Sequence, residues 1–399
     1  MAHKHSYPLL WLYVAITLFS THSKAVEIVT YGETNTPMSE TLAFSKDSVG
    51  IDLNELGFYK FSVAATGLVG HQTNPTPGNN QTISDLSNAQ VLIEKLEGPI
   101  QLFAIAGSYS IAELSAPYVR SSKLPNDTWG YLPAGWLKIP VGENFSVLAG
   151  KLFAIGGLEG TFSYENTNIQ RGLIWKQTSS VTRGVQFDYH DDNIYAGIAI
   201  TDGSYSNKYN WLGAQINYEI DKTNAVTVSW NGSLSANALQ TDSTPLLQNN
   251  SQISTLIYSY KSPYLTLSPY VQYSYVPERP SIGILGSAST QGIALLATYR
   301  LFPLDENGNP PHVNVSIPFR YEFIRSHGNT YTSDNDLLFG PNSSAWSATL
   351  TPTYQVGMYF ARLEASYVRA INATPGAAYG YSGTANNQAR FLLEAGILF

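Results

Sequence analysis

The stretch that decides the fold is the last one in the chain, NQARFLLEAGILF, residues 387–399. Counted back from Phe399 in steps of two, every residue to Ala389 is apolar, while the alternate positions include Arg390 and Glu394. A period of two is typical of a β-strand with one apolar face. The chain also ends on an aromatic residue, whereas the termini of soluble domains are usually frayed and polar. A strand of a soluble sandwich shows the same alternation, so the rest of the chain must decide between the two classes.

The composition favours a chain that contacts lipid. Charged residues make up 13% of the 399 residues, about half of the soluble average. Tyrosine and tryptophan, which prefer membrane interfaces, number 27 and 7. Cysteine is absent, which excludes disulfide frameworks, thiolate metal sites and cysteine nucleophiles.

The first residues, MAHKHSYPLLWLYVAITLFSTHSKA (1–25), predict a secretory signal peptide that is removed. Lys4 precedes an apolar run, and small residues end the segment at Ala25. The run is shorter than the roughly 20 apolar residues that a membrane-spanning helix needs. Removal of Lys4 and Lys24 changes the formal net charge from −7 to −9, so the basic surface that nucleic-acid binding requires is absent.

From residue 57 onward, the chain alternates between period-two segments and connections. The connections alternate between long and short, and two of them, 202–208 and 303–312, depart from this pattern. Long and short links in alternation, with an even number of strands, indicate an outer-membrane barrel with long extracellular loops and short periplasmic turns. The segments lie near 57–70, 87–96, 99–111, 136–141, 145–155, 181–190, 193–202, 209–220, 225–234, 252–261, 265–276, 289–301, 313–326, 344–355, 358–370 and 388–399.

The alternation within single segments agrees with this architecture. In VNVSIPFRYEF (313–323) apolar residues alternate with polar ones, and in YFARLEASY (359–367) Tyr359 and Tyr367 bracket a small apolar middle, as in the aromatic girdles of membrane barrels. We therefore predict an all-β fold, a transmembrane antiparallel β-barrel of about sixteen strands. Residues 1–25 form the signal peptide, 26–56 an N-terminal segment in the periplasm or the lumen, and 57–399 the barrel.

Two stretches resemble a known family more directly. ENFSVLAGKLFAIGGLE (143–159) and SSVTRGVQFDYHDDNIYAGIAITDG (179–203) are similar to Gram-negative outer-membrane porins, including the OmpL-like β-barrel porins and the phosphate-selective porins. The resemblance implies a homotrimer and an outer-membrane location. The pore ladder of arginine and lysine found in phosphate-selective members is not reproduced here, so anion specificity is not carried over.

The C-terminal segment has a second implication. Its alternating apolar strand closed by Phe399 resembles the targeting signal of outer-membrane proteins, which the barrel assembly machinery recognises. In a closed barrel this last strand pairs with the first, so that no edge remains.

The residues that could carry catalytic or metal-binding chemistry lie in predicted loops and turns. His190 lies beside Asp191 and Asp192, where hairpin-turn chemistry explains the residues without a metal. Asp334 and Asp336 offer oxygen ligands for calcium, but their spacing is not that of an EF-hand. No serine lies in a nucleophile-elbow context near a histidine. We expect no enzymatic activity, no cofactor and no metal.

The expected functional residues face the lumen. Alternation places charges of both signs on the inner wall. The third long connection, residues 156–180 (hereafter loop 3), is expected to fold inward, as in general porins, with its acids facing wall arginines across a narrow constriction. Its candidate residues are Glu159, Glu165 and Arg171. The pore-lining candidates are Lys60, Glu94, Glu219, Arg300, Arg320, Glu322, Arg362, Glu364, Arg390 and Glu394.

These features predict a porin, a passive diffusion channel for small hydrophilic solutes. A barrel of about 16 to 18 strands is wide enough for a water-filled lumen. Two alternatives remain. One is an outer-membrane adhesin or receptor whose long loops bind a partner. The other is a hydrophobic-solute transporter with residues 26–56 as a plug, which would want an apolar lumen in place of the mixed charges predicted here.

Overall fold

The computed structural model describes residues 42–45, 49–306, 308–328 and 337–399. The signal peptide predicted at 1–25 and the acidic loop residues Asp334 and Asp336 lie outside this part of the chain.

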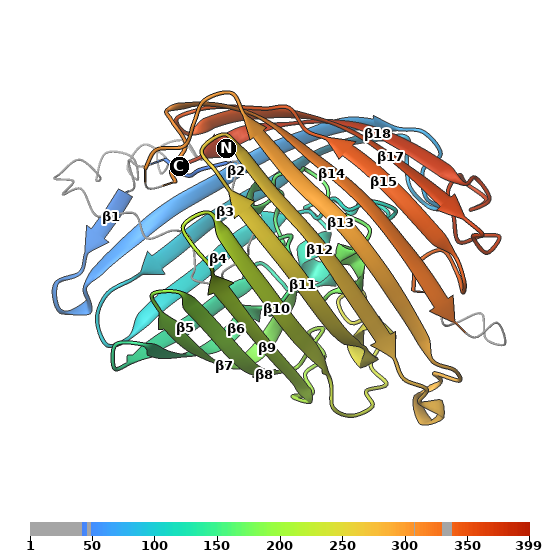
Figure 1. The fold of residues 1–399 in the computed structure, drawn as a ribbon, viewed down its shortest axis with the longest axis horizontal. Helices are drawn as coiled ribbons and strands as arrows, with labels where there is room; N and C mark the ends of the chain where they lie inside the picture. Colours follow the sequence, from blue (N-terminus) through green and yellow to red (C-terminus); the bar gives the residue numbers. More distant parts are fainter. Residues whose placement is uncertain (1–41, 46–48, 307, 329–336) are drawn as a thin grey trace, which may run out of the picture.

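The described residues form one antiparallel sheet that closes into a barrel, because β18 pairs with β2 (Figure 1). Closure gives each strand that crosses the barrel wall two neighbours, so that their main-chain groups are largely paired within the sheet, as a lipid environment requires. The barrel strands are β2 (Phe58–Gln72), β3 (Thr82–Lys95), β4 (Gln101–Tyr109), β5 (Ala134–Val141), β6 (Phe145–Phe153), β7 (Val181–Asp191), β8 (Ile194–Thr201), β9 (Trp211–Glu219), β10 (Asn224–Ser233), β11 (Gln252–Lys261), β12 (Leu265–Val276), β13 (Ala288–Arg300), β14 (Val313–Gly328), β15 (Ser344–Leu350), β16 (Thr353–Val356), β17 (Tyr359–Ile371) and β18 (Asn387–Leu398).

Sixteen strands cross the barrel wall, because β15 and β16 are two halves of one strand. Both halves lie between β14 and β17. The break falls at Pro352, which has no N–H to donate to the ladder. The prediction of a sixteen-stranded barrel is therefore confirmed, and each predicted segment overlaps a strand. The largest boundary error is at β3, which begins at Thr82 where the sequence suggested residue 87.

One short strand was not predicted. β1 (Val49–Asp52) lies within the N-terminal segment 26–56 and pairs with the first residues of β2, from Phe58 to Phe61. β18 pairs with β2 only from Ala64 onward. β1 therefore continues the line of β18 and covers an edge of β2 that would otherwise be open.

The outer face of the barrel is apolar. On β17 and β18 the side chains of Leu363 and Phe391 are 58% and 59% exposed, while their inward neighbours Arg362 and Leu392 are buried. Exposed apolar side chains on every second residue of the strands form the surface expected to face lipid. In the described part of the chain, none of the helices is long and apolar enough to cross a membrane.

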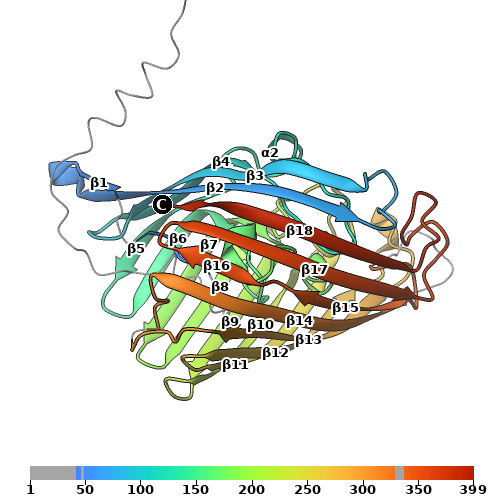
Figure 2. The ribbon, with the colours of Figure 1, turned by 90° about the horizontal axis from the view of Figure 1, so that it is seen from above.

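The connections differ between the two ends of the barrel. The longest lie at one end, and the C-terminus lies at the other (Figure 2). The described parts of the long connections contain four short helices, α2 (Leu124–Asp127), η2 (Ser163–Glu165), η3 (Trp175–Gln177) and η4 (Gln248–Asn250). η5 (Pro280–Ile282) lies in the connection before β13, and η1 (Asn54–Leu56) precedes β2.

The N-terminal segment also enters the barrel. The Ala43 N–H donates to Gln355 Oε1 on β16 at 3.0 Å, and Gln355 Nε2 donates to Ala43 O at 2.6 Å. Ser45 N–H donates to Leu398 O at 2.9 Å. Phe44 contacts Tyr164 of loop 3 edge-to-face, with ring centroids 5.9 Å apart. Leu42 is buried in the same apolar cluster. Part of the segment 26–56 thus packs against inward-facing residues.

Candidate functional site: the inner wall and loop 3

Three strands carry arginine and glutamate together on their inward faces. β14 has Arg320 and Glu322, and β17 has Arg362 and Glu364; both pairs are two residues apart, which places them on one side of the strand. β18 carries Arg390 and Glu394 at the same parity. All six side chains are at most 2% exposed. Charges buried this deeply must be paired and hydrogen-bonded, and their partners come mainly from loop 3.

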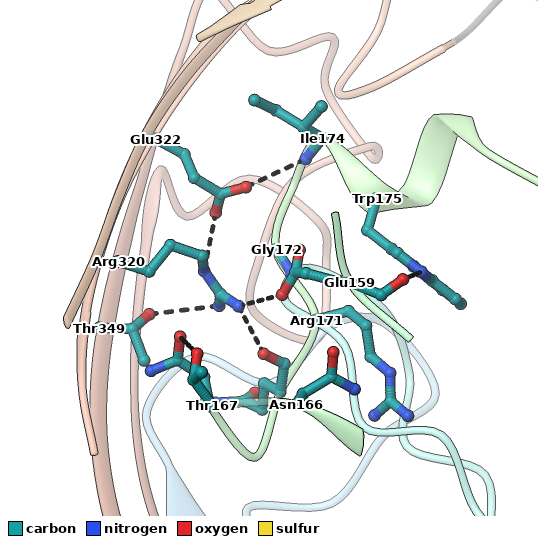
Figure 3. Close-up of polar contacts among 12 residues, drawn as sticks. Glu159, Asn166, Thr167, Arg171, Gly172, Ile174, Trp175, Arg320, Glu322 and Thr349 are labelled. Carbon is teal, nitrogen blue, oxygen red and sulfur yellow. Dashed lines mark hydrogen bonds and ion pairs between the residues drawn. The ribbon is translucent and has the colours of Figure 1, made fainter. Parts of the chain in front are cut away.

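Arg320 links β14 to loop 3. Its Nη1 donates to Glu159 Oε1 and to Gln170 O, both at 2.6 Å, and its Nη2 donates to Thr349 Oγ1 at 3.3 Å. Its Nε lies 3.3 Å from Glu322 Oε2. The guanidinium therefore lies between a wall carboxylate and a loop carboxylate, as Figure 3 shows.

Glu322 accepts main-chain donors from the same loop. The N–H of Ile174 donates to Glu322 Oε1 at 3.3 Å (Figure 3). The N–H of Leu173 and Ser347 Oγ donate to Glu322 Oε2 at 3.1 and 2.7 Å. Gly172 lies so close that an added Cβ would be 2.0 Å from Glu322 Oε1. A side chain at 172 would therefore have to displace the Glu322 carboxylate from its hydrogen bonds with the loop.

β17, two strands along the wall, repeats this arrangement. Arg362 pairs with Glu394 of β18, with Nε 2.7 Å from Oε2, and donates to the carbonyl oxygens of Asn166 and Ser163 at 2.8 and 2.7 Å. Glu364 accepts from Ile169 N–H at 2.5 Å. Loop 3 is therefore bound to the wall mainly through its own main chain.

Arg390 on β18 binds a second inward connection that sequence reasoning missed. Residues 110–133 (hereafter loop 2) place the carbonyl oxygens of Glu113 and Ala116 at 2.7 and 2.8 Å from its guanidinium. Arg390 also donates to Gln170 Oε1 of loop 3 at 2.8 Å. Loops 2 and 3 pair through main-chain bonds between Arg171 and residues 112 and 114. Only length distinguishes loop 2 in the sequence, and length does not predict where a loop folds.

Loop 3 also contacts wall strands on both sides of these three. On one side, Gln272 Nε2 on β12 donates to Ile174 O at 3.1 Å, and Asn231 Nδ2 on β10 donates to Ile155 O just before the loop at 2.8 Å. On the other side, Tyr164 OH donates to Gln90 Oε1 of β3 at 2.9 Å. The connection between β6 and β7 therefore extends across the barrel interior.

Burial shifts the titration of the loop charges. It raises the pKa of the Glu159 carboxyl to about 7, although Arg320 opposes the shift. Burial lowers the pKa of Arg171 to about 10, although four surrounding carboxylates oppose this shift. Burial also raises the pKa of Glu113 in loop 2. Arg171 is fully buried, and its Nη2 has no hydrogen-bond partner among the described residues.

A family model matches residues 59–399, which is most of the chain, and its description is "Putative beta-barrel porin-2, OmpL-like". The chain belongs to this family. It is a porin of the outer membrane, and membership indicates a non-enzymatic channel. No curated protein sequence matches the chain.

Solved structures of outer-membrane proteins share the fold of this porin. OmpT of Vibrio cholerae superposes with a TM-score of 0.55 at 10% identity, over 86% of this chain and 97% of that one. The outer membrane channel DcaP of Acinetobacter baumannii gives 0.54 at 10% identity, over 86% and 97%. OmpF of Salmonella typhi gives 0.53 at 12% identity, over 88% and 100%.

Four predicted lining residues of the porin lie away from loop 3. Lys60 and Glu94 form an ion pair between β2 and β3 at 3.6 Å. Arg300 is buried at the end of β13 and donates to Thr266 Oγ1 at 3.0 Å. Glu219 has inward parity but is exposed, because it is the last residue of β9 and lies at the rim beside a short turn.

The predicted separation of loop acids from wall arginines by a narrow constriction does not hold for Glu159. Glu159 contacts Arg320 directly, and both side chains are at most 1% exposed. Glu165 accepts from Phe162 N–H within loop 3 at 2.8 Å. These carboxylates bind partners that hold the loop in place and do not face open lumen, because a buried charge without a partner would be costly.

The remaining predicted features have local structural explanations. Phe399 continues the β18–β2 pairing through two main-chain bonds with Val63, at 2.6 and 2.9 Å. His190 lies at a hairpin, where its main chain bonds Asn144. Among the described residues, no group of three or more histidine, aspartate or glutamate side chains could hold a metal ion.

Proposed function

We propose that this porin passively conducts small hydrophilic solutes and that loop 3 sets the size limit of the passage. The observation that carries the proposal is the attachment of loop 3 across the interior by buried arginine and glutamate side chains of β14, β17 and β18. Such a loop has little freedom to move, because each displaced contact would leave a buried charge without its partner. Selectivity then follows from the lumen width and the lining groups that remain accessible.

We also propose three features of its biogenesis. Residues 1–25 direct export and are removed. The barrel assembly machinery recognises the strand that ends at Phe399. The folded porin associates as a homotrimer through its apolar outer face, in keeping with the family resemblance. The side-chain roles proposed for Arg320, Glu322, Arg362 and Glu364 are positional, because these residues hold loop 3 and have almost no exposed surface.

One observation favours a second candidate, a hydrophobic-solute transporter. The cluster that contains Leu42 and Phe162 also includes Phe103, Trp136 and Phe360, so one side of the interior is apolar and Leu42 and Phe44 of the N-terminal segment pack against it. A transporter for apolar compounds uses such a plug. The hydroxyl and amide groups on β10 to β12, such as Ser229, favour the porin.

Liposome swelling tests the proposal. Vesicles containing the purified porin should swell in neutral sugars, and the rate should fall steeply with sugar size, because a fixed loop excludes larger molecules. Swelling no faster than that of protein-free vesicles for every sugar would contradict passive conduction. That result would favour one of the two alternative functions, an adhesin or a hydrophobic-solute transporter.

A further inference from the structure

A cavity of about 400 Å³ lies at the extracellular end of the porin, between the end of β17 and the last long connection, residues 372–386. Its polar lining consists of one guanidinium, from Arg369, with the hydroxyls of Thr374 and Thr384 and the amides of Asn372 and Asn386. None of the described residues that line it is acidic. A cation surrounded by neutral hydrogen-bonding groups fits an anion.

Arg369, the charged residue of this cavity, lies on the outer face of the barrel. On β17, Arg369 shares its parity with the exposed Leu363 and lies beside Tyr367 on that face. It is exposed, and no described residue forms a hydrogen bond or ion pair with its side chain. An arginine on the lipid side of a barrel is costly near the bilayer centre but not at the interface.

Aromatic rings place Arg369 at that interface. Trp346 on β15 is its direct cross-strand partner. The Trp346 ring lies 5.4 Å from that of Tyr367 and 6.3 Å from that of Tyr321, so three large rings gather on the outer face at this level. Such belts lie at the headgroup level of a membrane. Arg325 on β14 is also exposed on the outer face, two strands away.

We propose that this cavity binds the phosphate-bearing headgroup of a glycolipid in the outer leaflet. Guanidinium binds phosphate through two parallel hydrogen bonds, which makes Arg369 the anchor. Thr384 and Asn386 donate to the remaining phosphate oxygens or to sugar hydroxyls. The source is a lipid and not a free anion, because Arg369, which lines the cavity, is exposed on the outer face directly across from Trp346 of the aromatic belt.

Binding measurements on the full-length folded porin in detergent test this site. The probes are lipopolysaccharide, the same lipid after removal of its phosphates, and inorganic phosphate. Arg369→Ala should weaken lipopolysaccharide binding about tenfold or more, and Arg369→Lys should weaken it less, because a lysine keeps the charge but not the two-bond geometry. Arg120→Ala, which removes an exposed arginine from loop 2, is the matched control and should bind as the wild type does.

Heat-dependent mobility on gels shows that each variant is folded. Equal lipopolysaccharide affinity of the wild type and Arg369→Ala would overturn the proposal. Equal affinity of the wild type for the phosphate-free lipid would overturn the phosphate contact. Binding of inorganic phosphate without binding of lipopolysaccharide would overturn the lipid source.

Discussion

Arg320 joins a wall strand to loop 3 through the carboxylates of Glu322 and Glu159. Removal of one partner from a buried ion pair costs about 3–5 kcal/mol, because the remaining charge stays buried alone. We expect Arg320→Ala to loosen loop 3 and to give larger and noisier single-channel currents. Ion preference should change little, because the side chain is 0% exposed.

The matched control for this variant is Arg300→Ala. Arg300 is an equally buried inward arginine, but it donates to Thr266 on the neighbouring strand. Its removal should leave the current noise as in the wild type. If the currents of Arg320→Ala are as quiet as those of the wild type, or if its reversal potential shifts strongly, Arg320 does not hold the loop in this way.

Glu159 gives the porin a testable pH dependence. Its pKa rises from 4.5 to about 7 on folding because the carboxyl is buried. A raised folded pKa means that this group stabilises the fold fully below its unfolded pKa and loses that contribution as the pH rises through 7. The temperature of the heat-induced mobility change should fall between about pH 5 and pH 8, and less so in Glu159→Gln. Glu165→Gln, a second loop acid, is the control, and identical slopes for Glu159→Gln and the wild type would contradict the assignment.

Single residues also show where sequence reasoning ends. Alternation correctly placed Arg320, Glu322 and Arg362 on the inner face, because a strand has a fixed period of two. Their partners could not be predicted. The N–H of Ile169 and the carbonyl oxygen of Asn166 occur in every peptide unit, so no residue type marks the loop segment that will bind a wall charge.

At the level of elements, strands were predictable and loop paths were not. The sixteen crossing strands follow from alternation and from the sorting of long and short links. β1 was missed because four residues, Val49–Asp52, are too few to show a period. Loop 2 was missed because it binds Arg390 through main-chain carbonyl oxygens, which no residue type marks.

The terminal element carries its own prediction. Phe399 bonds the main chain of Val63 and completes the seam between β18 and β2. Deletion of Phe399, or Phe399→Lys, should sharply lower the amount assembled in the outer membrane while export continues. Phe399→Tyr, which keeps the ring and both main-chain bonds, should assemble as the wild type does. Normal membrane levels of the deletion variant, measured by fractionation, would refute the targeting role.

The whole molecule is a closed barrel whose interior is partly occupied by its own chain. Loops 2 and 3 and residues 42–45 all contact inward-facing side chains. The sequence predicted the barrel and the inward course of loop 3. It predicted opposite charges that face each other across a narrow constriction, where the fold has buried ion pairs, because the sequence gives the sign of charges but not their separation.

Single-channel conductance tests the central claim most directly. Purified wild-type porin in a planar bilayer should give discrete, small current steps. A variant without residues 160–170 should give larger steps, because it lacks the segment attached to Arg362 and Glu364. An equal deletion in another long connection, residues 237–247, should leave the step size unchanged. The absence of steps in every variant would contradict the channel, and equal steps from the wild type and the loop 3 deletion would contradict the constriction.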